Sequence, residues 1–295
     1  MEKDLSILRK KINEALIKTI TRATTRAPVE IIRSLKKVEK EEESSLAVEQ
    51  LKLMLENFEY GEKKVIPICQ DTGVLNFFIL LGDKFPIISD FRTIIENAVD
   101  KATELVPLRG NSVDPLTNQN PENNLGINVP PIYLSISENS SNLKITILAK
   151  GGGAENISKL FMLNPSNALE EFQEKIVKAI KEAGGMPCPP VILGIGIGGD
   201  ASSCMKLAKE ALIRPLNQRH SREDVARLEI DLIQKINDLN IGVMGLGGKV
   251  TCLDVHIEVA MRHPASFPVG LIVQCYSHRW ASFEMNEEGE IIDET

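Results

Sequence analysis

The segment Val191-Ile-Leu-Gly-Ile-Gly-Ile-Gly-Gly-Asp200 begins as an apolar strand and leads through its glycines into the helical pattern of residues 201–212. A strand, a glycine-rich turn and a helix in this order are typical of α/β proteins. A dinucleotide-binding fingerprint would also need a second strand that ends in an acidic residue about 20 residues further on. Glu223 and Asp224 lie instead in the first turn of a predicted helix, which argues against a nicotinamide site. We expect the glycines to allow close backbone approach, and the helix N-terminus to offer N–H groups to an anion.

Strand and helix patterns continue on both sides of this segment. Period-two and apolar runs predict strands at 65–68, 75–81, 132–136, 143–149, 191–195, 251–260 and 269–274. Helical periodicity predicts helices at 91–106, 168–183 and 201–212, and a further helix that starts at a capping-box-like pair, Ser221 and Asp224. The acidic tail is expected to form a hairpin around Gly289.

Apolar residues at intervals of three or four predict a helical N-terminal region over residues 1–62. Within it the acidic run 39–43 is interpreted as a solvated helix end. The fold class expected is therefore α/β, with this helical region followed by two β-containing lobes flanked by helices, at 63–183 and 184–295. Each lobe carries candidate site residues, which are described below.

The composition excludes several classes of protein. The chain has 295 residues, of which 43% are hydrophobic and 25% charged, as in an ordinary globular protein. Its net charge of −7 is too acidic for nucleic-acid binding, and its apolar runs are too short to span a membrane. Nothing at the start resembles a secretory signal, so a cytoplasmic protein is expected. The five cysteines are an odd number without CxxC spacing, which argues against a disulfide framework and a zinc ribbon.

The cysteines fall into two groups by their sequence surroundings. Cys69, Cys188 and Cys275 lie at the ends of predicted strands or in a proline-rich turn, where active sites are commonly built. Cys204 lies within a predicted helix and Cys252 within a predicted strand, where a thiol acts as a small buried apolar group. Three cysteines at strand ends or in a turn, and two inside predicted elements, suggest a metal site with three thiolate ligands. The long Asn- and Pro-rich stretch 111–131 is expected to be a functional loop.

Six motifs, in order along nearly the whole chain, resemble the alpha-type portion of class I fumarate hydratase and L-tartrate dehydratase. They are Ile68-Cys-Gln-Asp-Thr-Gly73, Pro107-Leu-Arg-Gly-Asn111, Lys150-Gly-Gly-Gly-Ala-Glu-Asn156, Pro187-Cys-Pro-Pro190 with residues 194–200, Gly245-Leu-Gly-Gly-Lys249, and Arg262-His-Pro-Ala-Ser-Phe-Pro268 with Gln274-Cys275. Enzymes of this family are iron–sulfur hydro-lyases. The resemblance implies a [4Fe–4S] cluster held by Cys69, Cys188 and Cys275, with one iron left open to bind substrate as a Lewis acid.

The remaining candidate site residues come from the same motifs. Arg109 suits a substrate carboxylate because its planar guanidinium can bind it with two hydrogen bonds; the alternative for this residue is a surface ion pair. The resemblance places Gln70 and Asp71 against the substrate, with Asp71 as a catalytic residue. His263 is a second catalytic candidate because histidine exchanges protons near neutral pH. Backbone N–H groups of Gly152 and Gly153 and the charge of Lys249 complete the predicted substrate site.

The resemblance also implies a partner. Single-chain members of the family continue into a beta-type domain that supplies a catalytic threonine base and further basic contacts. Because this sequence stops at Thr295, we expect a separate beta-type subunit, an assembly of two alpha and two beta subunits, and an active site completed at their interface. The expected reaction is the reversible hydration of fumarate to malate on a small dicarboxylate substrate. L-tartrate dehydration and a non-catalytic iron–sulfur binding protein remain as alternatives.

Overall fold

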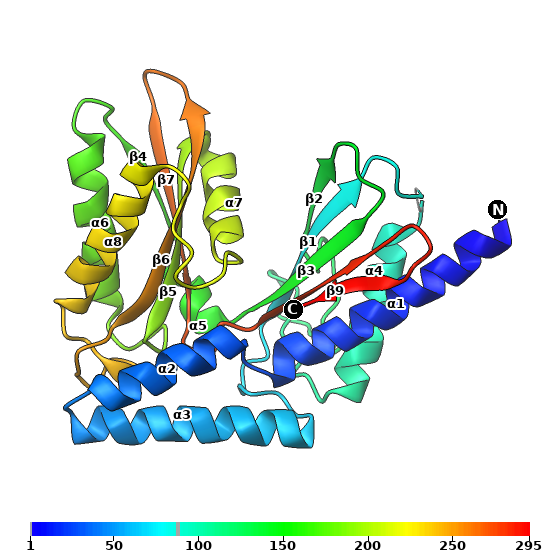
Figure 1. Ribbon diagram of the computed structural model, residues 1–295, viewed down its shortest axis with the longest axis horizontal. Helices are drawn as coiled ribbons and strands as arrows, with labels where there is room; N and C mark the ends of the chain where they lie inside the picture. The colour runs from blue at the N-terminus through cyan, green and yellow to red at the C-terminus, as the bar shows by residue number, and fades with distance from the viewer. Residues whose placement is uncertain (1, 87–88) are drawn as a thin grey trace. The chain divides into compact units, whose positions relative to one another are not determined.

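A computed structural model describes residues 2–86 and 89–295 and divides the chain into two compact units, each with its own sheet (Figure 1). Unit 1 comprises the residues up to Pro28, Asn57–Lys150 and Arg279–Thr295, and unit 2 comprises Val29–Glu56 and Gly151–His278. Both units combine helices with a mixed sheet, so the expected α/β class is confirmed, as is the helical N-terminal region.

The units do not follow the three consecutive segments expected at 1–62, 63–183 and 184–295. The chain passes to unit 2 at Val29, returns to unit 1 at Asn57, enters unit 2 again at Gly151 and ends in unit 1. Its last two strands belong to unit 1 because the first of them pairs with a strand more than a hundred residues earlier in the sequence, and the second pairs with the first. Local periodicity carries no information about such distant pairing.

Unit 1 is a five-stranded sheet with helices packed on it. The strand order is β2-β1-β3-β8-β9, and only β1 and β2 pair in parallel. The strands are β1 (Val74–Gly82), β2 (Ile132–Ser137), β3 (Leu143–Lys150), β8 (Trp280–Met285) and β9 (Ile291–Glu294). Helices α1 (Glu2–Thr25) and α4 (Phe91–Leu105) share one apolar core with this sheet, which contains buried side chains such as Leu16, Ile95 and Phe77.

The predicted strands and helix of unit 1 are confirmed with one exception. Residues 65–68 form no strand, although valine and isoleucine favour one. Helix α3 (Ser45–Lys64) instead ends directly before Val65, which has φ 54° and an exposed side chain, and Ile66 N donates a hydrogen bond to Gly61 O. The predicted hairpin at the tail is confirmed as β8 and β9, with Gly289 at φ 73° in the turn.

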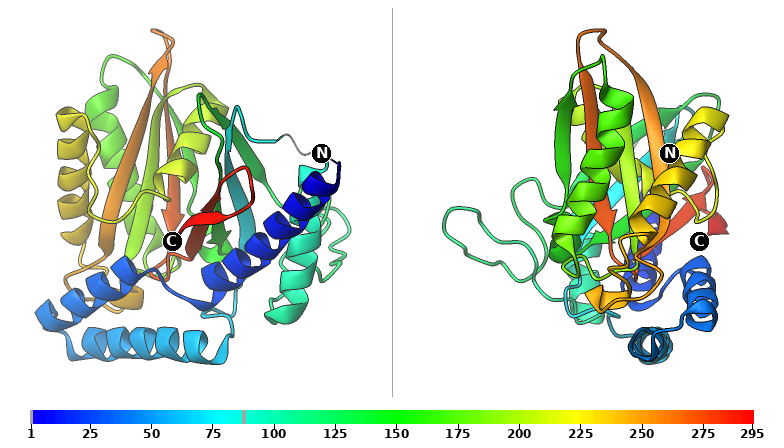
Figure 2. Two further views of the ribbon diagram at one scale, coloured as in Figure 1. Left: turned by 45° about the vertical axis from the view of Figure 1, so that its right-hand side comes forward. Right: turned by 90° about the vertical axis from the view of Figure 1, so that its left-hand side faces the viewer.

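Unit 2 is a four-stranded sheet between helices. The order is β4-β7-β5-β6, with β5 parallel to β6 and β7 antiparallel to both neighbours. The strands are β4 (Lys159–Leu163), β5 (Val191–Gly199), β6 (Cys252–Arg262) and β7 (Phe267–Gln274). Helices α6 (Ala168–Ala183) and α8 (Glu223–Asn237) cover one face and α7 (Ala201–Ala211) the other (Figure 2). Three further helices are α2 (Val29–Glu41), the one-turn α5 (Gly152–Glu155) and the 3-10 turn η1 (Val243–Gly245).

The predicted helices of unit 2 form, but the expected capping box does not. Helix α8 begins at Glu223 after Arg222, whose side chain makes no cap hydrogen bond. Asp224 forms an ion pair with Arg222 at 2.6 Å instead of completing a box with Ser221. Strand β4 and helix α5 were not predicted, since each is five residues or fewer and too short for a periodic pattern.

The glycines of the opening segment allow α7 to pack directly on the sheet. Strand β5 presents Val191, Leu193 and Ile195 to the core under α6 and α8, so alternate residues face α7. A Cβ atom at Gly194 would lie 2.0 Å from Ala208 O, and one at Gly196 would lie 2.0 Å from Cys204 O. The backbones of strand and helix therefore approach more closely than any other residue would permit.

This packing gives a first testable prediction. We expect Gly196→Ala to lower the free energy of unfolding by about 3 kcal/mol, because the added methyl group meets helix backbone that cannot move alone. The measurement is chemical denaturation of the full chain. Gly126→Ala is the control, since no atom lies within 4 Å of its added Cβ. Equal denaturation midpoints for the two variants would contradict the packing argument.

Candidate functional site

The Cys69–Gly73 loop of unit 1 is held by hydrogen bonds on both sides. Before it, Ile68 N donates to Thr24 O at 3.0 Å and Asn57 Nδ2 donates to Ile68 O at 2.7 Å. Within it, Gly73 N donates to Asp71 Oδ1 at 3.0 Å, which forms a turn closed by the aspartate side chain. Cys69 and Asp71 are half-buried and Gln70 is exposed, so the loop presents all three near the surface of the unit.

The loop that carries Arg109 is fastened to the Cys69–Gly73 loop. Asn111 Nδ2 donates to Thr72 Oγ1 at 2.9 Å, and Thr72 Oγ1 donates to Arg109 O at 3.2 Å. Asn111 N in turn donates to Oδ1 of Asn124, at 2.8 Å. Asn124 is 6% exposed, so the Asn-rich stretch contributes a buried anchor that connects both loops. Sequence reasoning missed the anchoring roles of Thr72, Asn111 and Asn124, although Asn111 stands in one of the quoted motifs.

The charge of Arg109 is not paired with that of any described residue. Its side chain is exposed, and it takes part in no ion pair with any residue that the structure describes. The alternative interpretation as a surface ion pair is therefore not supported. Thr72 holds the backbone carbonyl of Arg109, and the guanidinium of this residue is exposed. Such a group is suited to bind a carboxylate from outside the unit.

In unit 2, Cys188 and Cys275 lie at the same end of the sheet. Cys188 comes shortly before β5, Cys275 follows β7 directly, and Ile192 of β5 pairs with Gln274 of β7. Tyr276 N donates a hydrogen bond to Cys188 O at 3.2 Å, which joins the two segments beyond the strands. Both cysteines are half-buried, and Cys275 Sγ lies 3.1 Å from Ser277 Oγ.

The turn at Cys188 is built from closely packed backbone. Cys188 has φ 54°, and its N–H donates to Gly185 O at 3.0 Å. Met244 N donates to Pro189 O at 2.8 Å, which ties the turn to η1. A Cβ at Gly185 would lie 2.9 Å from Met244 O, so this glycine is needed for packing as well as for the turn. Only the turn was expected from the sequence.

The two remaining cysteines are buried structural residues, as predicted. Cys204 lies on α7 and donates to Ala201 O, and Cys252 opens β6 and donates to Asp254 O. Burial raises the pKa of the Cys204 thiol, and it raises the pKa of Cys252 well above the usual range. Both thiols therefore stay protonated at neutral pH, whereas a metal ligand must be a thiolate.

The helix N-terminus after the glycine motif is not an anion site. Asp200 caps α7 with its own carboxylate, which accepts hydrogen bonds from Ser202 N at 3.0 Å and Ser203 N at 2.7 Å. These bonds lower the pKa of Asp200 to about 2. The expectation that this terminus offers free N–H groups is therefore wrong. The end of β5 at Gly199 is also opposite to the end that carries Cys188.

The other predicted substrate residues are spread over unit 2. Gly152 and Gly153 are exposed at the start of α5. His263 lies in the turn between β6 and β7, separated from Cys275 by the eight residues of β7. A strand of this length spans roughly 25 Å. His263 and Cys275 thus occupy opposite ends of one strand, and the structure does not bring them together within the unit.

Lys249 lies in an exposed ion pair. Its Nζ is 2.6 Å from Glu43 Oε1, and its backbone N donates to Glu42 Oε2 at 2.8 Å. The hydrogen bond with Glu43 raises the pKa of Lys249. The acidic run at 39–43 is therefore more than a solvated helix end, because Glu42 and Glu43 hold the glycine loop of Lys249. This charge pairing was missed because Glu43 and Lys249 are 206 residues apart.

Two buried histidines differ in how they are paired. His256 is fully buried, with Nδ1 3.1 Å from Ala211 O and Nε2 3.1 Å from Asp254 Oδ2. His278 is also fully buried, but neither ring nitrogen has a hydrogen-bond partner among the residues that the structure describes. Burial lowers the pKa of His278 to about 3, so this ring is neutral at physiological pH.

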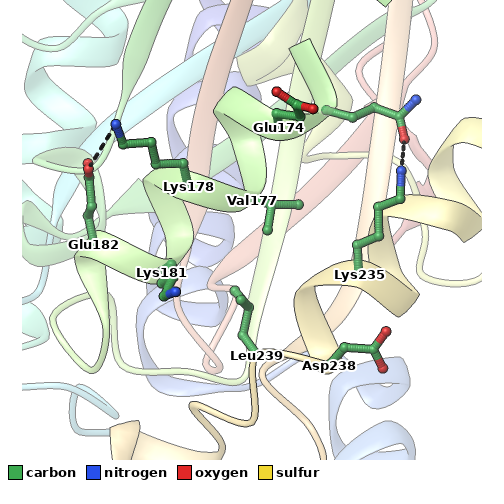
Figure 3. A pocket seen from close by; sticks show the side chains of 9 residues that line it. Glu174, Val177, Lys178, Lys181, Glu182, Lys235, Asp238 and Leu239 are labelled. Carbon is green, nitrogen blue, oxygen red and sulfur yellow. Dashed lines mark hydrogen bonds and ion pairs between the residues drawn. The ribbon is translucent and has the colours of Figure 1, made fainter. Parts of the chain in front are cut away.

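One large surface hollow is distinct from all these residues. It has a volume of about 920 Å³ and lies between α6 and α8 (Figure 3). Its polar side chains interact largely with each other, as in the bond of 2.8 Å from Lys235 to Gln173 and the ion pair of 3.8 Å between Lys178 and Glu182. None of the predicted site residues lines it, so it is not the candidate active site.

Comparison with known proteins identifies the family. The family model described as fumarate hydratase (Fumerase) matches residues 13–284. A putative L(+)-tartrate dehydratase subunit alpha of Methanocaldococcus jannaschii is 42% identical over 275 residues, which cover 92% of this chain and 96% of the relative. The L(+)-tartrate dehydratase subunit alpha of Escherichia coli K12 is 31% identical over 269 residues, 91% of this chain and 89% of the relative. The chain belongs to the fumarate hydratase family.

Membership of the fumarate hydratase family confirms the resemblance expected from the six motifs, to the alpha-type chain of class I fumarate hydratase and tartrate dehydratase. The chain is therefore a lyase of the hydro-lyase type. Among residues 2–86 and 89–295, no helix is both long and apolar enough to cross a membrane. Both relatives are named for L(+)-tartrate dehydration, the alternative reaction, and not for the hydration of fumarate.

Proposed function

We propose that the chain is the alpha subunit of an L(+)-tartrate dehydratase whose active site is completed by a beta-type subunit. The observation that carries this proposal is the match, over nine-tenths of the chain, to relatives named as alpha subunits of that enzyme. Those names also support a beta-type partner, and we propose an assembly of two alpha and two beta subunits. The five cysteines, an odd number, fit a reducing compartment, so we place the enzyme in the cytoplasm.

We further propose that Cys69, Cys188 and Cys275 ligate a [4Fe–4S] cluster. The donor set fits such a group, since these three thiols are half-buried while Cys204 and Cys252 are buried and protonated. The described residues contain no group of three or more His, Cys, Asp or Glu that could hold a single metal ion. Each cysteine of a cluster ligates a different iron, so its ligands lie further apart than those of one ion.

A cluster held by these cysteines would supply a Lewis acid for the substrate hydroxyl, and the chain's own groups supply binding and proton transfer. Arg109 binds one substrate carboxylate through its guanidinium, and Gln70 donates from its side-chain amide. Backbone N–H groups of Gly152 and Gly153, which are exposed residues, are proposed to bind the second carboxylate. Asp71 exchanges a proton with the departing hydroxyl, with Oδ1 oriented by Gly73 N.

His263 and Lys249 remain in the proposal with weaker structural support. His263 lies at the end of β7 opposite to Cys275, so a role in proton transfer requires it to act on a site in another subunit. Lys249 must leave its ion pair with Glu43 before it can approach a substrate. The general base is proposed to come from the beta-type partner.

Reversible hydration of fumarate is the second candidate, because the matching family model is described as fumarate hydratase. The test is to purify the chain with its beta-type partner without oxygen and to offer each substrate separately. Loss of water from tartrate gives an enol that becomes oxaloacetate, which a coupled dehydrogenase assay detects. Fumarate is followed directly by its absorbance.

We expect oxaloacetate to form from L-tartrate only when both subunits are present. The cluster-ligand variant Cys275→Ala, purified in the same way, provides the inactive control. Faster turnover of fumarate than of tartrate would assign the enzyme to the second candidate. If neither substrate is converted by the iron-loaded pair, the hydro-lyase assignment to these dicarboxylates is wrong.

A further inference from the structure

Arg279 is a deeply buried cation in unit 1. It directly precedes β8, and its backbone O accepts a hydrogen bond from Ala149 N at 2.9 Å. Only 1% of the residue is exposed, and it is the largest fully buried side chain among the described residues. No sequence motif drew attention to it, because a single arginine before an apolar strand has no distinctive pattern. Its burial is a property of the tertiary structure alone.

The guanidinium of Arg279 reaches the candidate site but forms no ion pair there with any of the described residues. Nη1 donates to Asp71 O at 2.6 Å, on the loop that begins at Cys69. Nε has no hydrogen-bond partner, and no carboxylate of the described residues pairs with Arg279. Other shielded arginines in the chain are paired, such as Arg22 with Glu294 at 2.9 Å and Arg219 with Asp254.

An isolated buried charge is strongly unfavourable, and a single carbonyl oxygen does not neutralise it. A bound ligand of opposite charge would neutralise such a group. We propose that Arg279 is the counter-charge for an anion bound at the Cys69–Gly73 loop. This inference rests on the proposed function, which provides two anions: a cluster that is negative once three thiolates ligate it, and the substrate dicarboxylate. Of these two anions we assign the cluster as the partner of Arg279, because Cys69 belongs to the same loop as Asp71.

If Arg279 is a counter-charge, its removal should affect the stability of the ligand-free protein in the opposite way from the removal of a purely structural arginine. Removing an unpaired buried charge leaves the empty protein as stable as before or more stable, but weakens retention of the anion. Removing a structural hydrogen bond to Asp71 O destabilises the empty protein and leaves retention unchanged. The variants are Arg279→Met, which has similar bulk without charge, and Arg279→Lys, which keeps the charge. Arg92→Met is the control, because Arg92 is an exposed arginine paired with Glu96 along α4.

The first measurement is iron loss from the anaerobically reconstituted full chain to a chelator. We expect roughly 30-fold faster loss or more in Arg279→Met, the scale for removing one partner of a buried charge pair. Arg279→Lys should be intermediate and Arg92→Met unchanged. The second measurement is thermal unfolding of the cluster-free chain, in which Arg279→Met should melt no lower than the wild type.

Other results of these measurements would reassign the anion or overturn the proposal. Unchanged iron retention together with weaker binding of L-tartrate, measured by calorimetry, would assign the anion to the substrate instead of the cluster. A lower melting temperature of the cluster-free Arg279→Met chain, with both kinds of binding intact, would overturn the proposal. If the wild type itself retains no iron, the cluster assignment fails, and the calorimetric comparison still decides whether Arg279 serves a bound anion.

Discussion

Replacing Cys69, Cys188 or Cys275 with alanine is expected to abolish cluster binding and all hydro-lyase activity. Each variant should fall from about four irons per chain to less than about one, because a cubane held by three protein thiolates does not persist with two. Iron and sulfide content after anaerobic reconstitution, together with the visible absorbance of the cluster, measure this loss. Activity should disappear in parallel.

The matched controls are Cys204→Ala and Cys252→Ala. Both thiols are buried and have raised pKa values, so their removal should change stability slightly and leave the iron content normal. An intact cluster in any one of the first three variants would refute the ligand assignment. Iron loss in either control variant, without unfolding, would instead point to a different set of ligands.

Asp71→Asn is expected to reduce kcat on the order of 10²–10⁴-fold while the iron content stays near normal. The reason is that an amide cannot donate or accept the proton that we assign to this carboxyl group. Its oxygen can still accept the hydrogen bond from Gly73 N, so the loop should keep its shape. The measurement is steady-state turnover of the complete two-subunit enzyme, with iron determined on the same sample.

Asp114→Asn is the control for this substitution. Asp114 forms a similar turn, with Oδ1 accepting from Leu116 N and Thr117 N at 3.0 and 2.8 Å. It belongs to the Asn-rich stretch and is not proposed to contact substrate. We expect its variant to keep full activity. Wild-type turnover by Asp71→Asn would remove Asp71 from the catalytic residues and leave proton transfer to the partner subunit.

Much of this protein follows from local sequence patterns. Apolar runs located β1 and β5, and helical periodicity located α4 and α6, because these patterns depend on neighbours a few residues away. The same local surroundings separated Cys204 and Cys252 from the other cysteines, and the burial of both confirms that distinction. Where a local signal was misleading, as at residues 65–68, the end of a long helix overrode the β preference of valine and isoleucine.

The sequence by itself thus determined the fold class, most of the strands and helices, the family and a set of candidate ligands. Only the tertiary structure decided that the glycines of β5 serve packing against α7, that Cys188 and Cys275 meet at one end of a sheet while His263 lies at the other, and that Arg279 is buried without a carboxylate. The physical reason is the range of the interactions. Helix and strand preferences act over a few residues, whereas these arrangements arise when strands and loops far apart in the chain pack together and exclude water.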